Sequence, residues 1–283
     1  EAWYEIYAAG YTTATAIAYN QRGLSGCMSV SEEAIGYIQQ EGLRRLNRLV
    51  KANQVGYLCC AGKASRARKI AQENDLSFDM PGSAPVDASE ALHCVRESYA
   101  VVQALAMLWI AEGRYSEIVR ELEKQIEIAA NRSEGRAVYK YKLLQAIALL
   151  HDGEQARAFA GFGEVMRYVR KQGLLRFVLD LAPYVTPLLE AYIMADDVRE
   201  RDHAAYLLVE LERGDSGPRD ISLSPREMQV LAELSDGHAD KVIARHLGVS
   251  ENTVRYHIKR LFAKLGVNSR LKVVSGAAKL GLL

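Results

Sequence analysis

The chain has 283 residues, of which 49% are hydrophobic and 25% charged, which is ordinary for a soluble globular protein and enough for two domains. Its composition, with only six prolines, favours helices over strands, and no strand pattern is convincing. No run of about eighteen uncharged apolar residues occurs, which argues against a membrane span and favours a cytoplasmic protein.

The first residue is Glu1, and no basic segment precedes an apolar run. We therefore expect no secretion signal and interpret the sequence as part of a longer polypeptide. The cysteines lack the CxxC spacing of common zinc sites and are interpreted as buried, reduced thiols. They are Cys27, Cys59, Cys60 and Cys94.

Before residue 213 the sequence is a succession of amphipathic helices separated by short breaks. Helical periodicity predicts helices over 93–112, 114–131, 136–151, 154–171, 174–194 and 198–213. Pro183 and Pro187 predict a kink or break in the fifth of these. Because paired helices repeat at about forty residues, we predict a tetratricopeptide-like α-solenoid over residues 1–212, with a sub-break near 80–89.

Residues 213–221 are rich in Gly, Asp, Ser and Pro, which is typical of a linker. Residues 222–283 then carry ten Lys or Arg against five Asp or Glu, a net charge of +5. The other residues carry 26 basic and 30 acidic side chains, a net charge of −4. This asymmetry is typical of a nucleic-acid-binding end attached to a body with another role.

Helix start and stop signals divide residues 222–283 into short helices. Ser224, Pro225 and Glu227 predict a capping box at the start of a helix that ends before Gly237. A second short helix begins near Asp240, whose carboxylate is expected to cap it.

A tight turn and a longer helix follow. Gly248 permits the turn, and Ser250 is expected to cap a third helix over 251–265. Ser269 is expected to cap a fourth helix. A short helix, a glycine turn and a longer helix predict a helix-turn-helix.

The third helix has two distinct faces. The residues expected to pack against the domain are Val254, Ile258, Leu261 and Leu265. The residues expected on the opposite face, as donors to bases and phosphates, are Arg255, Tyr256, Lys259 and Arg260.

The segment resembles the LuxR-type helix-turn-helix domain, whose motifs it matches at fixed spacing. The matching residues are Leu223, Arg226, Glu227, Val230, Leu231, Lys241, Ile243, Ala244, Leu247, Ser250, Thr253, Val254, Arg255, His257, Lys264, Leu265, Val267, Ser269 and Arg270. The resemblance implies a four-helix domain over 222–283 that binds double-stranded DNA as a homodimer or larger homo-oligomer, with its third helix in the major groove.

The same resemblance implies roles for individual residues. It assigns base-facing positions to Arg255, Tyr256 and Lys259. The residues that it makes candidates for contact with the DNA backbone are Lys241, Thr253, His257 and Lys264. Residues expected to divide between the core and a dimer surface are Val273, Val274, Ala277 and Leu280.

Two residues depart from the LuxR pattern. Asp240 stands where Asn is usual, and Val242 where Glu is usual. Because a carboxylate near phosphates weakens binding, we expect Asp240 to cap its helix instead of facing DNA. Tyr256 is bulkier than the residues common at its position, which leaves the operator sequence open.

The body resembles the helical-repeat region of MalT-like regulators over about residues 55–215. The tracts that carry this resemblance are LAMLWIAEGRYSEIVRELEKQIEIA, KLLQAIALLHDGEQARAFAGFGEVM and LLRFVLDLAPYVTPLLEAYI. It implies that ATP binds in an N-terminal module that precedes Glu1, and no cofactor is expected in this chain. It also implies an inducer or partner protein at the body, and allows contact with RNA polymerase.

Catalysis and metal binding are not indicated. The stretch from Gly56 to Lys63 is not a phosphate loop, because the spacing of its glycines differs and Ala64 stands where Ser or Thr is required. No HExxH or GxSxG motif occurs either. The histidines at 238, 246 and 257 have spacings of eight and eleven, which match no common metal motif. We therefore expect no enzyme within this chain.

The favoured function is a sequence-specific transcriptional regulator, more specifically an activator, whose helical body senses a small-molecule inducer or a partner protein. The alternative is a helical-repeat interaction scaffold whose tail no longer binds DNA, which Asp240 and Val242 would support. A quorum-sensing receptor fits poorly because its sensor would be expected to contain a β-sheet.

Overall fold

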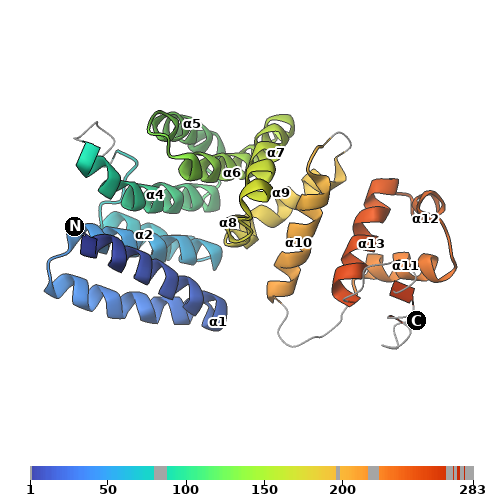
Figure 1. Ribbon diagram of the computed structural model, residues 1–283, viewed down its shortest axis with the longest axis horizontal. Coiled ribbons are helices and arrows are strands. Elements are labelled where there is room, and N and C mark those ends of the chain that lie inside the picture. Colours follow the sequence, from blue (N-terminus) through green and yellow to red (C-terminus); the bar gives the residue numbers. More distant parts are fainter. Residues whose placement is uncertain are drawn as a thin grey trace. The chain divides into compact units, whose positions relative to one another are not determined.

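A computed structural model of the chain describes residues 2–79, 88–195, 198–215, 223–265, 270, 273–274 and 277. In this described part the structure has thirteen helices and no strand, which confirms the all-α prediction (Figure 1). None of the described helices combines the length and the apolar composition that crossing a bilayer requires.

Contacts divide the chain into two compact units, Glu1–Phe162 and Gly163–Leu283. The second unit therefore also contains the predicted helices over 174–194 and 198–213 and part of the one over 154–171, all of which the sequence assigned to the body. Most of the predicted linker at 213–221, and part of the predicted sub-break at 80–89, lie outside the described residues. The domain limits 1–212, 213–221 and 222–283 stay a prediction.

The first unit contains the helices up to α7, the last of which continues into the second unit from Gly163. They are α1 (Ala2–Gln40), α2 (Arg44–Cys60), α3 (Ala64–Glu73), α4 (Ala88–Ala111), α5 (Tyr115–Asn131), α6 (Gly135–His151) and α7 (Gln155–Gln172). The second unit continues with α8 (Arg176–Leu179), α9 (Ala182–Met194), α10 (Arg201–Asp215), α11 (Pro225–Ser235), α12 (Asp240–Leu247) and α13 (Glu251–Leu265).

Helix α1 is two helices that fold back on each other (Figure 1). Gly23 interrupts the helical backbone with φ of 65°, a left-handed value that glycine adopts without a Cβ clash. The chain reverses there, so that Ala8 and Ile38 share one buried cluster and the rings of Tyr7 and Tyr37 lie 5.9 Å apart.

Left-handed residues end four successive helices at intervals of twenty residues. They are Gly113, Ser133, Gly153 and Gly173, with φ between 58° and 85°. Each turn bonds back to the helix before it, as where the Arg114 N–H donates to the Trp109 carbonyl at 2.9 Å. Helix pairs therefore repeat every forty residues, in agreement with the predicted solenoid. The tetratricopeptide likeness stays a prediction.

The helix over 174–194 is broken, as predicted, and forms α8 and α9. Pro183 lies in the first turn of α9, where its missing N–H costs no hydrogen bond, and Pro187 is accommodated inside the helix. The break therefore falls before Pro183, at Asp180 and Leu181.

Cys27 and Cys59 are buried and free, as predicted, whereas the side chain of Cys94 lies outside the described residues. Burial raises the pKa of the Cys27 thiol to about 11 and that of Cys59 to about 12, so both stay protonated near neutral pH. Cys60 is partly buried.

Candidate nucleic-acid interface

The helix-turn-helix begins at the predicted capping box of α11. The Glu227 backbone N–H donates to Ser224 Oγ at 3.2 Å, and the Ser224 N–H donates to Glu227 Oε2 at 2.7 Å. Pro225 occupies the first turn, where it has no intrahelical hydrogen bond to lose. Two otherwise unsatisfied donors are thus bonded, and the start of α11 is fixed.

The turn between α12 and α13 also forms as predicted. Gly248 has φ of 65°, and the following Val249 N–H donates to the Ala244 carbonyl at 3.0 Å. Ser250 Oγ then accepts from the Thr253 N–H at 3.1 Å and caps α13.

One buried cluster joins the helices of this domain. Its members are Val230, Leu231, Leu234, Ile243, Ala244, Val254, Ile258, Leu261, Val273 and Ala277. Val254, Ile258 and Leu261 lie in it as the spacing predicted, whereas the side chain of Leu265 lies outside the described residues. Packing of one face of α13 leaves its opposite face for other contacts.

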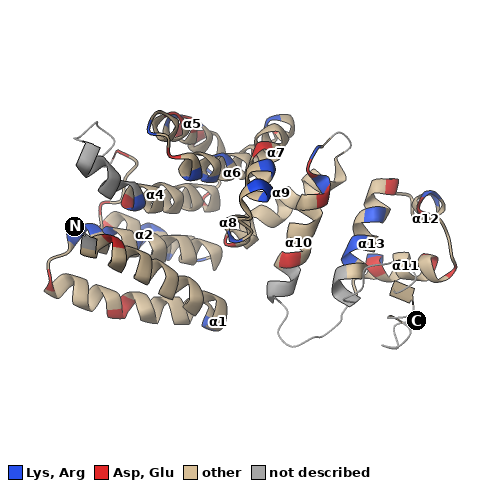
Figure 2. Cartoon of the chain, in the orientation of Figure 1, with Lys and Arg blue, Asp and Glu red and all other residues tan. Residues whose placement is uncertain are grey.

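The exposed face of α13 carries two of the three predicted base-facing residues. The side chain of Arg255 is 58% exposed and that of Lys259 is 43% exposed. Figure 2 shows basic residues along this helix. Both cations already have acidic partners, because Arg255 lies 3.5 Å from Glu251 and Lys259 pairs with Asp202.

Tyr256 and His257 do not lie on that face, because both side chains are buried. Arg260 Nη1 donates to Tyr256 Oη at 3.0 Å, and Arg260 Nε lies 2.8 Å from Oε1 of the buried Glu227. Their burial disfavours the predicted base contact of Tyr256 and the predicted backbone contact of His257. His257 instead belongs to a polar interior between α11 and α13, whereas Tyr256 lines a groove between α13 and α10.

His257 is neutral in this interior at physiological pH. The pKa of its imidazole is lowered to about 4, mainly by burial and to a smaller extent by the neighbouring Arg260 cation. Glu227 opposes this shift, and Arg226 adds to it. His257 Nδ1 has no hydrogen-bond partner among the described residues.

The other residues predicted to contact the DNA backbone differ in their exposure. Lys241 is exposed on the first turn of α12, and Thr253 is half-buried at the start of α13. The side chain of Lys264 lies outside the described residues. DNA contact by these three residues stays a prediction.

Asp240 is the first residue of α12 and does not cap it, which corrects the sequence-based expectation. The N-cap is Ala239, without a side-chain hydrogen bond. The Asp240 carboxylate instead lies 2.6 Å from Arg270 Nη1 and 3.4 Å from Arg255 Nε. Asp240 therefore forms ion pairs with two arginines, and its negative charge is also favourable at a helix N-terminus.

The face of α13 contacts α9 and α10 within the second unit. Thr253 Oγ1 lies 3.4 Å from Met194 Sδ, and Lys259 pairs with Asp202. A groove of about 510 Å³ lies along this contact, lined by residues that include Asn252 and Tyr256. No local sequence signal indicated these partners, because Asp202 and Lys259 are 57 residues apart in the chain.

Two of the four residues expected to divide between the core and a dimer surface lie in the core, and the dimer surface stays a prediction. Val273 and Ala277 are fully buried in the shared cluster, so neither is free to contact a second copy. Val274 is partly buried against the same cluster. Leu280 and the predicted cap Ser269 lie outside the described residues.

A capped, tightly packed helix-turn-helix with cations on its longest helix defines a DNA-binding domain. Residues 221–277 match the family of bacterial regulatory proteins, luxR family. The C-terminal part of the chain is therefore a LuxR-type helix-turn-helix domain, as the resemblance predicted. No solved structure matches the chain.

The curated relatives are transcriptional regulators by name. The chain is 36% identical to the probable transcriptional regulatory protein SgaR of Hyphomicrobium methylovorum over 128 residues, 45% of this chain and 54% of SgaR. It is 21% identical to the HTH-type transcriptional regulator AlkS of Alcanivorax borkumensis over 282 residues, 96% of this chain and 31% of AlkS. These names agree with the expectation of a regulator and not an enzyme. The chain thus spans about half of SgaR and a third of AlkS.

Proposed function

We propose that this chain regulates transcription by sequence-specific binding to double-stranded DNA through α13. The observation that carries the proposal is the exposed face of α13, with Arg255 and Lys259 on a LuxR-type helix-turn-helix. Arg255 is the proposed base reader, because a guanidinium forms two hydrogen bonds to the major-groove edge of guanine. Lys241, Thr253 and Lys264 are proposed to contact the phosphates.

Replacement of Arg255 by alanine is expected to weaken operator binding by about 1–3 kcal/mol, or roughly 5- to 150-fold. The operator is first selected from random duplexes with the full chain. Binding is then measured by fluorescence anisotropy at one fixed salt concentration, with a scrambled duplex for the non-specific affinity. The loss should be confined to the operator.

Arg120→Ala is the matched control, since Arg120 is an exposed arginine on α5 and its loss removes the same charge. It should leave operator binding unchanged. Equal operator affinities for wild type and Arg255→Ala would refute the assigned reading residue. Absence of any salt-dependent binding to duplex DNA by the wild-type chain would favour the interaction scaffold.

We further propose that α9 and α10 restrain DNA binding. The supporting observations are the contacts of Met194 with Thr253 and of Asp202 with Lys259. A residue held in these contacts has to leave them before it reaches DNA. A signal that moves α9 and α10 away from α13 would then raise the affinity for DNA.

Asp202→Ala is expected to increase operator affinity by up to about fivefold, since an exposed ion pair is worth about 0–1 kcal/mol. Asp180→Ala is the control, because Asp180 forms an ion pair with Arg176 on α8 and its loss changes the net charge equally. Anisotropy titrations of both variants separate release of α13 from a general charge effect. An equal gain in the two variants would count against the restraint.

The wider role of the protein is proposed from the resemblances to LuxR-type and MalT-like regulators. The proposal includes activation, a small-molecule inducer or partner protein at the helical body, and homo-oligomers on the DNA. It also includes the MalT-like architecture with ATP bound in another module, contact with RNA polymerase and a cytoplasmic location. The alignment with AlkS over 96% of this chain supports a relation beyond the DNA-binding domain.

A further inference from the structure

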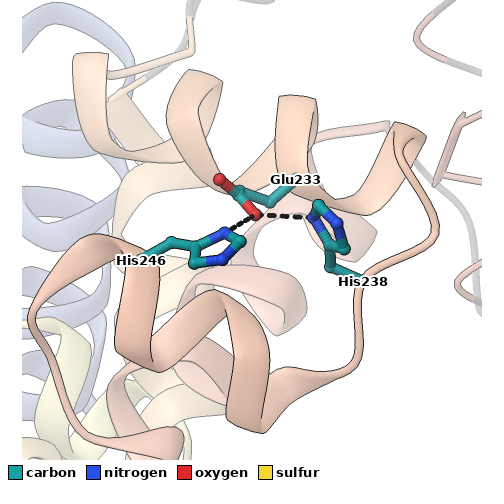
Figure 3. Close-up of side chains that lie close together, drawn as sticks. All are labelled: Glu233, His238 and His246. Carbon is teal, nitrogen blue, oxygen red and sulfur yellow. Dashed lines mark hydrogen bonds and ion pairs between the residues drawn. The ribbon is translucent and has the colours of Figure 1, made fainter.

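We infer that Glu233, His238 and His246 form a binding site for a zinc ion on the helix-turn-helix domain. Glu233 lies near the end of α11, His238 in the connection to α12, and His246 near the end of α12. Their side chains converge on one point, with both imidazole rings directed at the carboxylate (Figure 3).

The three ligand atoms already lie at nearly metal-binding separations. Glu233 Oε2 is 2.8 Å from His238 Nδ1 and 2.9 Å from His246 Nδ1, and all three atoms lie within 4.8 Å of one another. Zinc bonds of roughly 2.0–2.2 Å in a tetrahedral site need ligand atoms about 3.3 Å apart. Each histidine Nδ1 therefore lies about half an ångström closer to Glu233 Oε2 than such a zinc site requires.

The backbone holds the connection that carries His238 in place. Gly237 has φ of 79°, which turns the chain back over α11, and the His238 N–H donates to the Glu233 carbonyl at 3.2 Å. The Arg270 guanidinium donates to the His238 carbonyl. These contacts fix the backbone of the connection without an ion.

The site is also open to solvent. The side chains of Glu233, His238 and His246 are 20%, 38% and 44% exposed. An ion can therefore reach the three ligand atoms without unfolding of the domain, and the exposed histidines are free to make the small adjustment.

The ligand chemistry favours zinc over magnesium or calcium. Two imidazole nitrogens and one carboxylate oxygen suit zinc, whereas magnesium and calcium prefer oxygen ligands throughout. In the absence of an ion, the imidazole Nδ1–H groups donate to Glu233. When zinc binds, each neutral imidazole carries its proton on Nε2 instead, so that the Nδ1 lone pair ligates the ion. Water completes the fourth position, and the bound ion ties the end of α11 to the end of α12.

The test is isothermal titration of the metal-stripped full chain with zinc chloride. We expect one binding event that is lost, or weakened by at least about tenfold, in the double variant His238→Gln/His246→Gln, since removing even an outer-shell partner costs that much. Glu233→Gln should show the same loss. Magnesium chloride should produce no such event with the wild-type chain.

Three controls separate zinc binding at this site from binding by other residues and from a loss of folding. His151→Gln, which alters an exposed histidine on α6, should bind zinc as the wild type does. Cobalt(II) in place of zinc should give a spectrum without thiolate-to-metal charge transfer, which excludes the cysteines. Hydrogen exchange of the metal-free variants should match the wild type. Unchanged zinc binding by the double variant, or a thiolate band, would overturn the inference.

Discussion

Replacement of Glu227 by alanine is expected to lower the free energy of opening of the helix-turn-helix by about 3–5 kcal/mol, the usual cost of breaking a buried ion pair. Glu227 is fully buried 2.8 Å from Arg260 Nε, and its other oxygen accepts the Ser224 N–H. Alanine leaves the Arg260 cation without its carboxylate and removes half of the capping box. Native-state hydrogen exchange of peptides within 225–265 measures this free energy in the full chain.

Two further variants identify the source of the loss. Glu227→Gln keeps a side-chain acceptor for the Ser224 N–H and removes only the charge, so we expect a smaller loss. Glu251→Ala removes an acidic residue from the first turn of α13, where the side chain is 43% exposed, and should cost less than about 1 kcal/mol. A loss below 1 kcal/mol for Glu227→Ala would mean that Arg260 finds solvent or another partner.

Acid is expected to weaken the helix-turn-helix through His257, by about 3 kcal/mol between pH 6.5 and pH 4. The folded-state pKa of His257 is about 4, below the ordinary value of 6.5. As the pH falls through this window the unfolded state takes up a proton that the folded state does not, so stability decreases. Below pH 4 both states are protonated and the dependence on His257 ends.

His257→Gln is expected to flatten this pH dependence. Hydrogen exchange of the 225–265 peptides, corrected for intrinsic rates at each pH, measures the slope. His151→Gln, on α6 in the other unit, should leave that slope as in the wild type. Glu233 also has a lowered pKa, owing mainly to its hydrogen bond from His246, but its contribution is lost below pH 4.5. Identical slopes for wild type and His257→Gln would contradict the expectation.

Local signals predicted the framework of the DNA-binding domain. The capping box at Ser224, the left-handed turn at Gly248 and the cap at Ser250 each depend on residues at most five positions apart, so they can be found in the sequence. The all-α fold follows from the same short-range periodicity. The role of Asp240 could not be predicted in this way, because its partners Arg255 and Arg270 lie 15 and 30 residues away in the sequence.

The faces of α13 were harder to predict. Periodicity separates a packed side from an exposed side, but it does not show which residues at the margin are covered. Tyr256 lies at that margin, where Arg260 donates to its hydroxyl. The cluster of Glu233, His238 and His246 likewise forms only when α11 and α12 fold together, since its members are five and thirteen residues apart.

The acidic partners of Arg255 have a consequence for binding to DNA. Asp240 and Glu251 lie 3.4 and 3.5 Å from its guanidinium and act as counterions that are part of the chain itself. A mobile anion that leaves a protein cation on DNA binding gains the entropy of dilution, but these carboxylates remain attached. They stay near the duplex and repel its phosphates unless they too are neutralised. Arg255 therefore exchanges one fixed ligand for another, which favours geometry over charge as the basis of its selectivity.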